Sequence, residues 1–327
     1  MANLVDTFGR AHRYLRISVT DRCGFRCVYC MPPEGIPWRE REEILTYEEI
    51  VRLARLFASM GVDKIRLTGG EPTVRKGLET LIGDLARIPG VRSLLMTTNG
   101  TTVAAKAGTY RRAGLTGMNV SLDTLRPGRF LEITRRDRYQ DVMDGIAAAI
   151  AEGFTPLKLN VVVMAGINDD ELVEFVDHFR DQPVNVRFIE FMPFDGNGWS
   201  KGGLVPYREM RERIESAYRL SPIDSGPNAV AKDFAIEGRE ATVSFVTSMT
   251  ESFCAGCNRI RLTAEGNVKA CLFGPEEFPL RDRLRAGATD EEISATIREA
   301  VTRKAAGHAP AEILARIKNR SMIQIGG

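Results

Sequence analysis

The six cysteines of this 327-residue chain stand in two groups of three. They are Cys23, Cys27 and Cys30 in the first group, and Cys254, Cys257 and Cys271 in the second. So few cysteines in so long a chain do not make a disulfide scaffold, so we interpret them as reduced metal ligands. Three thiolates suit a 4Fe-4S cluster that keeps one iron open for another ligand. Structural zinc takes four ligands, and pooling both groups would supply them with two thiols left over, so zinc remains the alternative.

The composition limits the classes of partner. The chain has 45 Lys and Arg against 43 Asp and Glu, so a net charge of +2 predicts no general nucleic-acid binding, and any polyanion site must be local. No apolar run is long enough to span a membrane, and residues 1–15 lack a secretory pattern, so we expect a cytoplasmic protein. His12, His178 and His308 fall outside every motif, and we expect them mainly at the surface.

Strand-like and helix-like segments alternate through the first two thirds of the chain. The expected strands are Tyr14–Thr20, Lys64–Thr68, Ser93–Thr98, Gly117–Leu122, Leu157–Val163 and Asn185–Phe191. The expected helices are one opened by a capping box at Thr46 and Glu49, then Leu78–Ile88, Val103–Ala113, Tyr139–Glu152, Asp169–Arg180 and Tyr207–Ser216. Six βα repeats predict a parallel sheet, either doubly wound or curled into a partial barrel.

The alternation of side chains along the strands favours the barrel. Polar residues recur on one face of all six strands, whereas both faces of a doubly wound sheet should be apolar. An open barrel can use a polar concave face as a binding cavity. The residues predicted to face this lumen include four cations, followed by further polar positions and Met192: Arg16, Lys64, Arg66 and Lys158, then Ser18, Thr20, Thr68, Thr97, Asn99, Asn119, Ser121, Asp123, Asn160, Glu190 and Met192. Four lumen cations could neutralise most of a triphosphate.

The last third of the chain changes character. Residues 218–248 are rich in Gly, Pro, Asp and Ser, with short β-like pieces such as Ala241–Val246, and no βα repeat continues there. A helix is expected near Glu291–Thr302. We therefore predict a barrel over residues 1–217 and a C-terminal region over residues 218–327 that carries the second cysteine group.

Two motifs resemble the radical S-adenosylmethionine (SAM) superfamily. The first cysteine group has the CxxxCxxC spacing with Tyr29 before its third cysteine, and Gly69-Gly70-Glu71 follows the second strand, like the superfamily's GGE motif. The first group directly follows the first strand, where a barrel carries its active site. The resemblance implies that the open iron chelates the methionine amine and carboxylate of SAM, and that one electron then splits the sulfonium to give a 5′-deoxyadenosyl radical.

Further segments are similar to the GTP 3′,8-cyclase family, which performs the first step of molybdenum-cofactor biosynthesis. They are residues 15–23, 97–100, 119–123 and 191–193, the second cysteine group with Arg259-Ile260-Arg261, and the terminal Gly326-Gly327. Gly24 departs from the family pattern, in which Asn is commoner. The resemblance covers nearly the whole chain and implies a partial (βα)6 barrel of TIM type, two 4Fe-4S clusters, SAM, and GTP as the substrate.

The same resemblance assigns roles to individual residues. It implies that the first cysteine group holds the SAM cluster and the second holds a cluster near the guanine. It also implies SAM contacts at Tyr29, Gly70, Ser121 and Met192. The implied GTP contacts are Arg16, Lys64, Arg66, Thr97, Lys158, Arg259, Ile260 and Arg261. Catalytic roles are implied for Arg259, Arg261, Gly326 and Gly327, with the small terminal glycines entering the active site.

The implied reaction removes hydrogen from C3′ of GTP, and the C3′ radical then attacks C8 of the guanine. Implied partners are an electron donor such as flavodoxin or ferredoxin, a downstream cyclic pyranopterin monophosphate synthase, and a second copy in a homodimer. Two alternatives stay open. A peptide-modifying radical SAM enzyme would share the first cysteine group without needing the lumen cations, and a zinc-stabilised binding protein would contain no iron.

Overall fold

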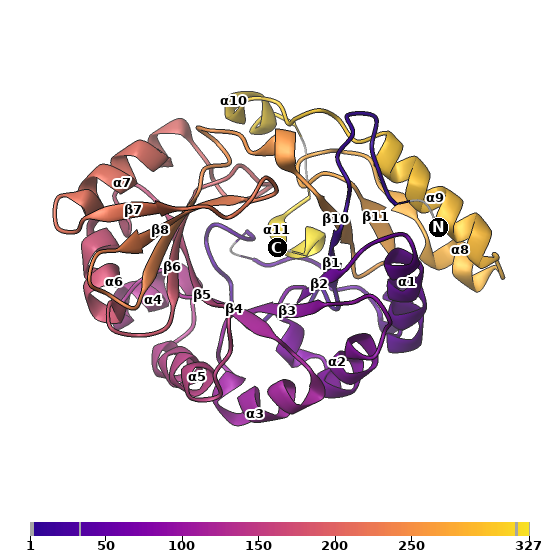
Figure 1. Ribbon diagram of the computed structural model, residues 1–327, viewed down its shortest axis with the longest axis horizontal. Helices are drawn as coiled ribbons and strands as arrows, with labels where there is room; N and C mark the ends of the chain where they lie inside the picture. Colours follow the sequence, from indigo (N-terminus) through magenta and orange to yellow (C-terminus); the bar gives the residue numbers. More distant parts are fainter. Residues whose placement is uncertain (1–2, 33, 318–319, 327) are drawn as a thin grey trace.

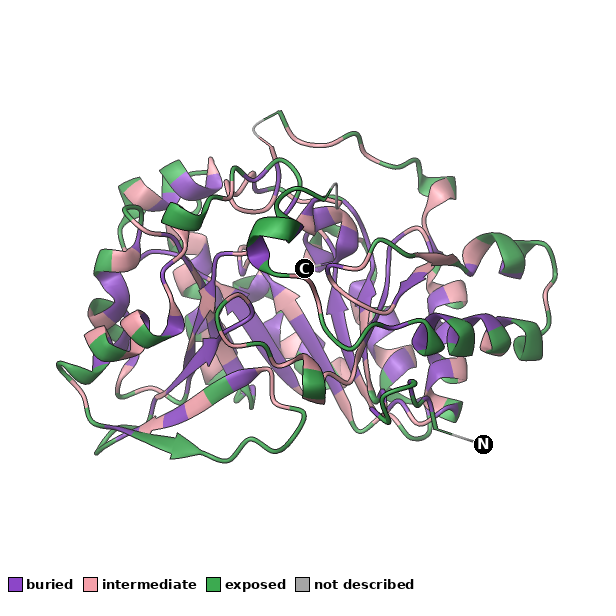
Figure 2. Ribbon diagram, turned by 90° about the horizontal axis from the view of Figure 1, so that it is seen from above, coloured by how far each residue is buried: buried purple, intermediate pink, exposed green. Residues whose placement is uncertain are grey.

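The computed structural model of the chain describes residues 3–32, 34–317 and 320–326. These residues form a twelve-stranded sheet in the order β12-β11-β10-β1-β2-β3-β4-β5-β6-β9-β8-β7. The sheet curls into an open barrel, with helices α1 to α7 around its outside and the short helix α11 inside the arc (Figure 1). Buried residues dominate the central strands, while the helices expose one side to solvent (Figure 2). The predicted partial barrel is therefore confirmed.

Parallel strands build the barrel wall. They are β1 (Tyr14–Ser18), β2 (Lys64–Thr68), β3 (Ser93–Thr98), β4 (Gly117–Ser121), β5 (Leu157–Val163), β6 (Asn185–Glu190), β9 (Thr242–Val246) and β10 (Arg259–Leu262). Antiparallel strands extend both ends, namely β7 (Leu220–Ile223) and β8 (Ala231–Ile236), and β11 (Asn267–Lys269) and β12 (Phe278–Pro279). The sheet thus runs continuously across residue 217, and the domain boundary there stays a prediction.

The helices divide into an outer layer and a C-terminal group. The outer helices are α1 (Tyr47–Ser59), α2 (Leu78–Ala86), α3 (Val103–Ala113), α4 (Pro127–Thr134), α5 (Tyr139–Ala151), α6 (Leu172–Phe179) and α7 (Tyr207–Glu215). The C-terminal helices are α8 (Arg281–Arg285), α9 (Asp290–Thr302), α10 (Ala311–Leu314) and α11 (Met322–Ile325). None of the helices formed by the described residues has the length and apolar character needed to span a membrane.

Helix α1 begins where the capping box predicts. The Thr46 hydroxyl accepts from the Glu49 backbone N–H at 3.2 Å, and the Glu49 carboxylate accepts from the Thr46 N–H at 2.8 Å. Its buried residues include Ile50, Leu53 and Phe57, which face the sheet at helical spacing. Helix α4 was not predicted, because it has only eight residues and begins with Pro-Gly, a pair that also marks turns.

The strand register arranges the lumen side chains in layers. Arg16 of β1 lies opposite Arg261 of β10 on one side and Arg66 of β2 on the other. One layer lower, Tyr14 lies between Arg259 and Lys64 in the same way. Residues in register share a face of the sheet, so side chains from β10, β1 and β2 form two cation-rich rows on the concave face.

Glu190 corrects one detail of the predicted lumen. It is fully buried at the end of β6 and its carboxylate accepts backbone N–H bonds from Tyr207 at 2.9 Å, Met249 at 2.7 Å and Thr250 at 3.0 Å. The carboxylate therefore ties β6 to the start of α7 and to the segment after β9. The lumen side of β6 is instead the alternate face, which carries Arg187 and Ile189.

Replacement of Glu190 by Ala is expected to destabilise the barrel by about 3 kcal/mol, because it leaves several buried N–H donors without an acceptor. Anaerobic chemical unfolding measures the loss. Glu190→Gln keeps one acceptor oxygen and should lose less. Equal stability of the Ala variant and the wild type would contradict this role.

Candidate active site

The first cysteine loop lies at the carboxyl edge of β1, against the end of α4. The Arg26 N–H donates to the Thr134 carbonyl at 2.9 Å, and the Val28 N–H donates to the Ile133 carbonyl at 3.0 Å. These backbone bonds hold a loop that has no strand or helix of its own. Helix α4 therefore helps to position the cysteines.

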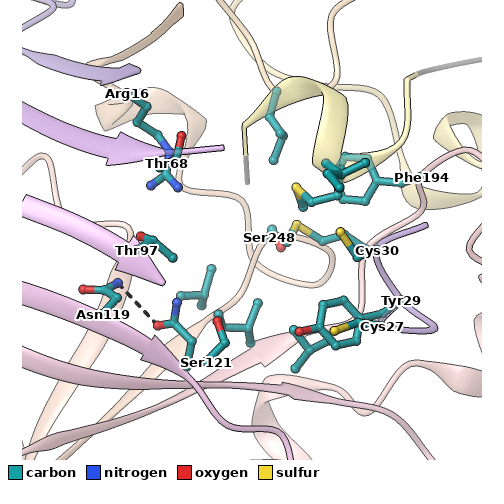
Figure 3. Close-up of a pocket in the computed structure, with 18 of the residues that line it drawn as sticks. Arg16, Cys27, Tyr29, Cys30, Thr68, Thr97, Asn119, Ser121, Phe194 and Ser248 are labelled. Atoms are coloured by element: carbon teal, nitrogen blue, oxygen red, sulfur yellow. Dashed lines mark hydrogen bonds between the residues drawn. The ribbon is translucent and has the colours of Figure 1, made fainter. Parts of the chain in front are cut away.

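All six cysteines line a single cavity of about 300 Å³. The first group enters it from the loop after β1, and the second group enters from the chain segments on both sides of β10 and β11. Figure 3 shows Cys27 and Cys30 beside Tyr29, across the cavity from the strand ends that carry Arg16, Thr68 and Thr97. Tertiary structure thus brings together two groups that are far apart in sequence.

Gly70 allows the chain after β2 to approach the first cysteine loop. Its N–H donates to the Thr20 carbonyl at 2.7 Å, and the next N–H, of Glu71, donates to the Arg22 carbonyl at 2.8 Å. A Cβ atom on Gly70 would lie 2.4 Å from that Arg22 oxygen. Any larger residue must therefore displace the cysteine loop.

Glu71 of the GGE motif braces the ends of two strands. Its carboxylate accepts bonds from the hydroxyls of Thr73 and Thr98, both at 2.7 Å, and from the Asn99 N–H at 2.5 Å. Burial raises the pKa of this carboxyl group, and these donors oppose the rise. The side chain both lines the cavity and joins β2 to β3.

The predicted SAM contacts lie together. Tyr29, Gly70, Ser121 and Met192 all line the cavity that holds the cysteines, and Figure 3 shows Tyr29 and Ser121. Asn119, next to Ser121 on the same face, donates to the Asn160 side chain at 3.4 Å. The four residues thus share one cavity, and their role in binding SAM stays a prediction.

The predicted GTP contacts occupy two depths of the lumen. Arg16, Thr97, Arg259 and Arg261 line the cavity itself. The other three polar residues, Lys64, Arg66 and Lys158, lie on the same strand faces but outside the cavity lining. Ile260 points the opposite way, because it alternates with two lumen arginines, and its side chain is buried in the hydrophobic core. That side chain is therefore unavailable to the cavity.

Tyr14 connects three of these cations. The Arg66 Nε donates to its hydroxyl at 2.5 Å, and the Lys64 ammonium lies 4.9 Å from its ring centre. Burial opposes ionisation of Tyr14, but Arg66, Arg16 and Lys64 outweigh it and lower the pKa of the phenol to about 7. When ionised, the phenol partly neutralises the positive charges of Arg66, Arg16 and Lys64.

Burial works against the positive charges of the lumen. Burial is the largest cause of the lowered pKa values of Arg16, about 10, and of Lys158, about 8, and neighbouring arginines contribute to both shifts. Crowded, buried cations favour an anionic ligand, because its charge relieves both the desolvation and the mutual repulsion.

Arg187 is a lumen cation that the sequence analysis missed. It lines the cavity from β6, and burial followed by Arg66 lowers its pKa to about 10. Side chains alternate between the two faces of β6, but polar residues occur on both faces, so the alternation alone does not show which face points inward. Only the register with Asn160 of β5 and Ser244 of β9 identifies the inward face.

Lys304 is a second missed residue, and it lies beside the second cysteine group. Its Nζ donates to the Cys257 Sγ at 3.3 Å and to the Arg259 carbonyl at 2.9 Å. Burial opposes ionisation of Cys257, yet the charges of Arg259 and Lys304 lower the pKa of this thiol to about 6. No sequence motif surrounds Lys304, so only the tertiary structure reveals it.

The histidines differ from the prediction that they lie mainly at the surface. His178 is exposed, but His12 is buried and its Nε2 lies 3.1 Å from the Asp6 carboxylate. Burial lowers the pKa of His12 to about 4. His308 lines the cavity, with its ring 4.9 Å from that of Phe273.

The C-terminal tail enters the lumen. The Gly326 carbonyl accepts from Arg261 Nη1 at 2.9 Å and from the Thr68 hydroxyl at 3.2 Å. Gly326 has a positive φ of 79°, and a Cβ atom there would lie 2.7 Å from the Ser18 Cβ. The site therefore requires glycine at this position. Gly327 lies outside the described residues.

Each cysteine group supplies the three thiols that an iron–sulfur cluster with one open iron would need. Among the described side chains, no three from His, Cys, Asp or Glu form a group that could hold a single metal ion. The ligands of a 4Fe-4S cluster need not converge on one ion, because each cysteine binds a different iron. Both cysteine groups supply three thiols to the same cavity. When bound there, such clusters would each keep an iron free to face the cavity.

Comparison with known proteins identifies the family. The Radical SAM superfamily matches residues 17–179, and the family described as Molybdenum Cofactor Synthesis C matches residues 184–310. The chain is 52% identical over 325 residues to "GTP 3′,8-cyclase, mitochondrial" of Arabidopsis thaliana, covering 99% of this chain and 83% of that protein. The chain belongs to the GTP 3′,8-cyclase family.

A bacterial relative in this GTP 3′,8-cyclase family has nearly the same length. "GTP 3′,8-cyclase" of Moorella thermoacetica is 45% identical, over 98% of this chain and 99% of the relative. The chain spans about half the length of its animal relatives, such as "Molybdenum cofactor biosynthesis protein 1" of Bos taurus, of which it covers 51%. The crystal structure of Streptococcus suis SuiB shares the fold, with a TM-score of 0.61 at 14% identity over 88% of this chain and 68% of that one.

Gly70→Ala is expected to remove about half of the bound iron, because its Cβ would push the first cysteine loop out of place. Gly24→Ala is the matched control, since a Cβ there meets nothing within 4 Å although Gly24 lies in the same loop. Iron analysis of anaerobically purified protein provides the comparison. Full iron content in the Gly70 variant would refute the argument.

Proposed function

We propose that this protein is a lyase that converts GTP into (8S)-3′,8-cyclo-7,8-dihydroguanosine 5′-triphosphate, at the first step of molybdenum-cofactor biosynthesis. The observation that carries this proposal is the meeting of both cysteine groups and the lumen arginines in one cavity. Names of relatives at 52% and 45% identity support the same reaction.

The proposed cofactors are SAM and two 4Fe-4S clusters. Membership in the radical SAM superfamily implies SAM and one cluster, and the second cysteine group supports the other. When bound, the first cluster and SAM would supply the 5′-deoxyadenosyl radical that removes the C3′ hydrogen of GTP. Tyr29, Gly70, Ser121 and Met192 would hold SAM against the cluster loop.

The lumen cations would bind the triphosphate. Arg16 and Arg261 lie at the cavity wall, and Lys64, Arg66 and Lys158 add positive charge below it. Charge-assisted hydrogen bonds to phosphate are strongest where water is excluded, as it is around these buried groups. Thr97 adds a neutral hydroxyl to this surface.

Arg259, Arg261 and the tail would act nearest the reacting atoms. The second cluster would hold the guanine, so that C8 lies close to the C3′ radical, which is a positioning role. Arg261 donates to the Gly326 carbonyl, and this bond directs the end of the chain toward the lumen. Catalytic roles for Arg259, Arg261, Gly326 and Gly327 are part of the proposal.

The proposed partners follow from the reaction. An electron donor such as flavodoxin or ferredoxin would reduce the SAM cluster, and a cyclic pyranopterin monophosphate synthase would consume the product. We further propose a homodimer that acts in the cytoplasm without nucleic-acid or membrane partners. The six cysteines form no disulfide bonds with one another, which agrees with a reducing compartment.

Anaerobically purified protein is expected to be brown and to contain about eight iron atoms per chain, because two 4Fe-4S clusters hold four each. Iron and acid-labile sulfide analysis makes the measurement. Colourless protein containing zinc and no sulfide would overturn the cluster proposal.

Arg261→Ala is expected to reduce cyclisation of GTP at least tenfold, because it removes a buried cation that also holds the tail. SAM cleavage without GTP should persist. Product formation is followed with GTP and with ATP, which no variant should cyclise.

Arg87→Ala provides the control for that experiment, since Arg87 is exposed and forms a local ion pair with Asp84. Unchanged cyclisation in the Arg261 variant, or equal turnover of ATP and GTP by the wild type, would count against the proposal.

A further inference from the structure

Lys304 is a buried cation in contact with a cysteine of the second group. Only 5% of its surface is exposed, although it follows the surface helix α9. Its ammonium has two hydrogen-bond acceptors, the Cys257 sulfur at 3.3 Å and the Arg259 carbonyl at 2.9 Å. Lys304 therefore joins the segment after α9 to both a predicted metal ligand and the adjacent strand β10.

Arg10 holds the segment that presents Lys304. Its guanidinium donates to the carbonyls of Ala305 and Ala306, both at 2.7 Å, and to the Cys254 carbonyl at 2.8 Å. Asp6 in turn accepts from Arg10 Nε at 2.6 Å. One N-terminal arginine thus binds the backbone next to Lys304 and the backbone of the first cysteine in the second group.

This arrangement is costly unless the nearby sulfurs carry negative charge. Lys304 is only 5% exposed, and the Cys257 sulfur lies 3.3 Å from its ammonium nitrogen. A thiolate-bound cluster would supply such charge permanently, because cysteine binds iron as the thiolate.

We propose that Lys304 is a positioning residue for the second iron–sulfur cluster, where it donates a hydrogen bond to the Cys257 sulfur and stabilises the reduced cluster. The inference rests on the proposed function, since it requires a cluster on the second cysteine group. Hydrogen bonds to ligand sulfurs and nearby positive charge favour the more negative, reduced form of a cluster. Lys304 accordingly raises the reduction potential of this cluster and secures its ligand.

The test uses the full chain with Cys23, Cys27 and Cys30 replaced by Ala, so that iron signals arise from the second group alone. Two further substitutions are compared in this protein. Lys304→Met keeps the approximate length of the side chain without its charge, and Lys304→Arg keeps the charge. Lys106→Met on the outer helix α3 is the control. A redox titration followed by electron paramagnetic resonance reports the potential, and iron analysis reports the occupancy.

Lys304→Met is expected to shift the potential to more negative values and to lower the iron content, while Lys304→Arg restores most of the potential. An unchanged potential and full iron in the Met variant would overturn the role of Lys304. If the Met variant does not fold, Lys304→Gln replaces it as the uncharged variant, and a potential of Lys304→Arg as negative as that of Lys304→Gln would overturn the role equally. If the protein that lacks Cys23, Cys27 and Cys30 but keeps Lys304 binds no iron, the second cluster itself is rejected. The two-cluster part of the proposed function is then rejected with it.

Discussion

The parallel pairing of β10 with β1 places Arg259 and Arg261 beside Tyr14 and Arg16. This single contact between distant segments brings the second cysteine group to the cavity that the first group lines. Like charges directly opposite each other destabilise neighbouring strands, and here Arg16 has an arginine on both sides. The pairing is compatible with a stable sheet because the opposite faces of these strands, with residues such as Leu15 and Ile260, are fully buried in the core.

Side chains from distant parts of the sequence support the loop that carries Cys254 and Cys257. In the loop before β10, Arg10 binds the Cys254 carbonyl and Lys304 binds the Cys257 sulfur. The first group is supported differently, by α4 and by the close approach of Gly70. The two cysteine loops therefore depend on different parts of the fold for support.

The tail adds a third contribution to the same cavity. Gly326 reaches the layer above the arginines, where its carbonyl meets Thr68 and Arg261. Arg261 is buried and donates a hydrogen bond to the Gly326 carbonyl. The position of the tail and the position of this lumen charge therefore depend on each other. The bond to the Gly326 carbonyl therefore orients the Arg261 guanidinium within the lumen before any ligand binds.

Much of the fold followed from local patterns. The capping box at Thr46 and the alternation along β1 and β2 predicted a helix and an inward face that the structure confirms. Pattern reasoning failed at α4, which is short and begins like a turn, and at β6, where Arg187 and Glu190 put polar groups on both faces. In each case the information that decides the structure is a contact outside the segment.

The sequence by itself determined the family, the division of the cysteines into two groups and the inward face of most strands, because cysteine spacing and period-two alternation are local properties. Only the tertiary structure decided that both cysteine groups meet, that Ile260 turns to the core while Arg259 and Arg261 turn inward, and that Lys304 touches Cys257. Those facts depend on strand register and on long-range packing. Neither leaves a periodic signal in the chain, because the partners are separated by many residues and meet only when the sheet has curled.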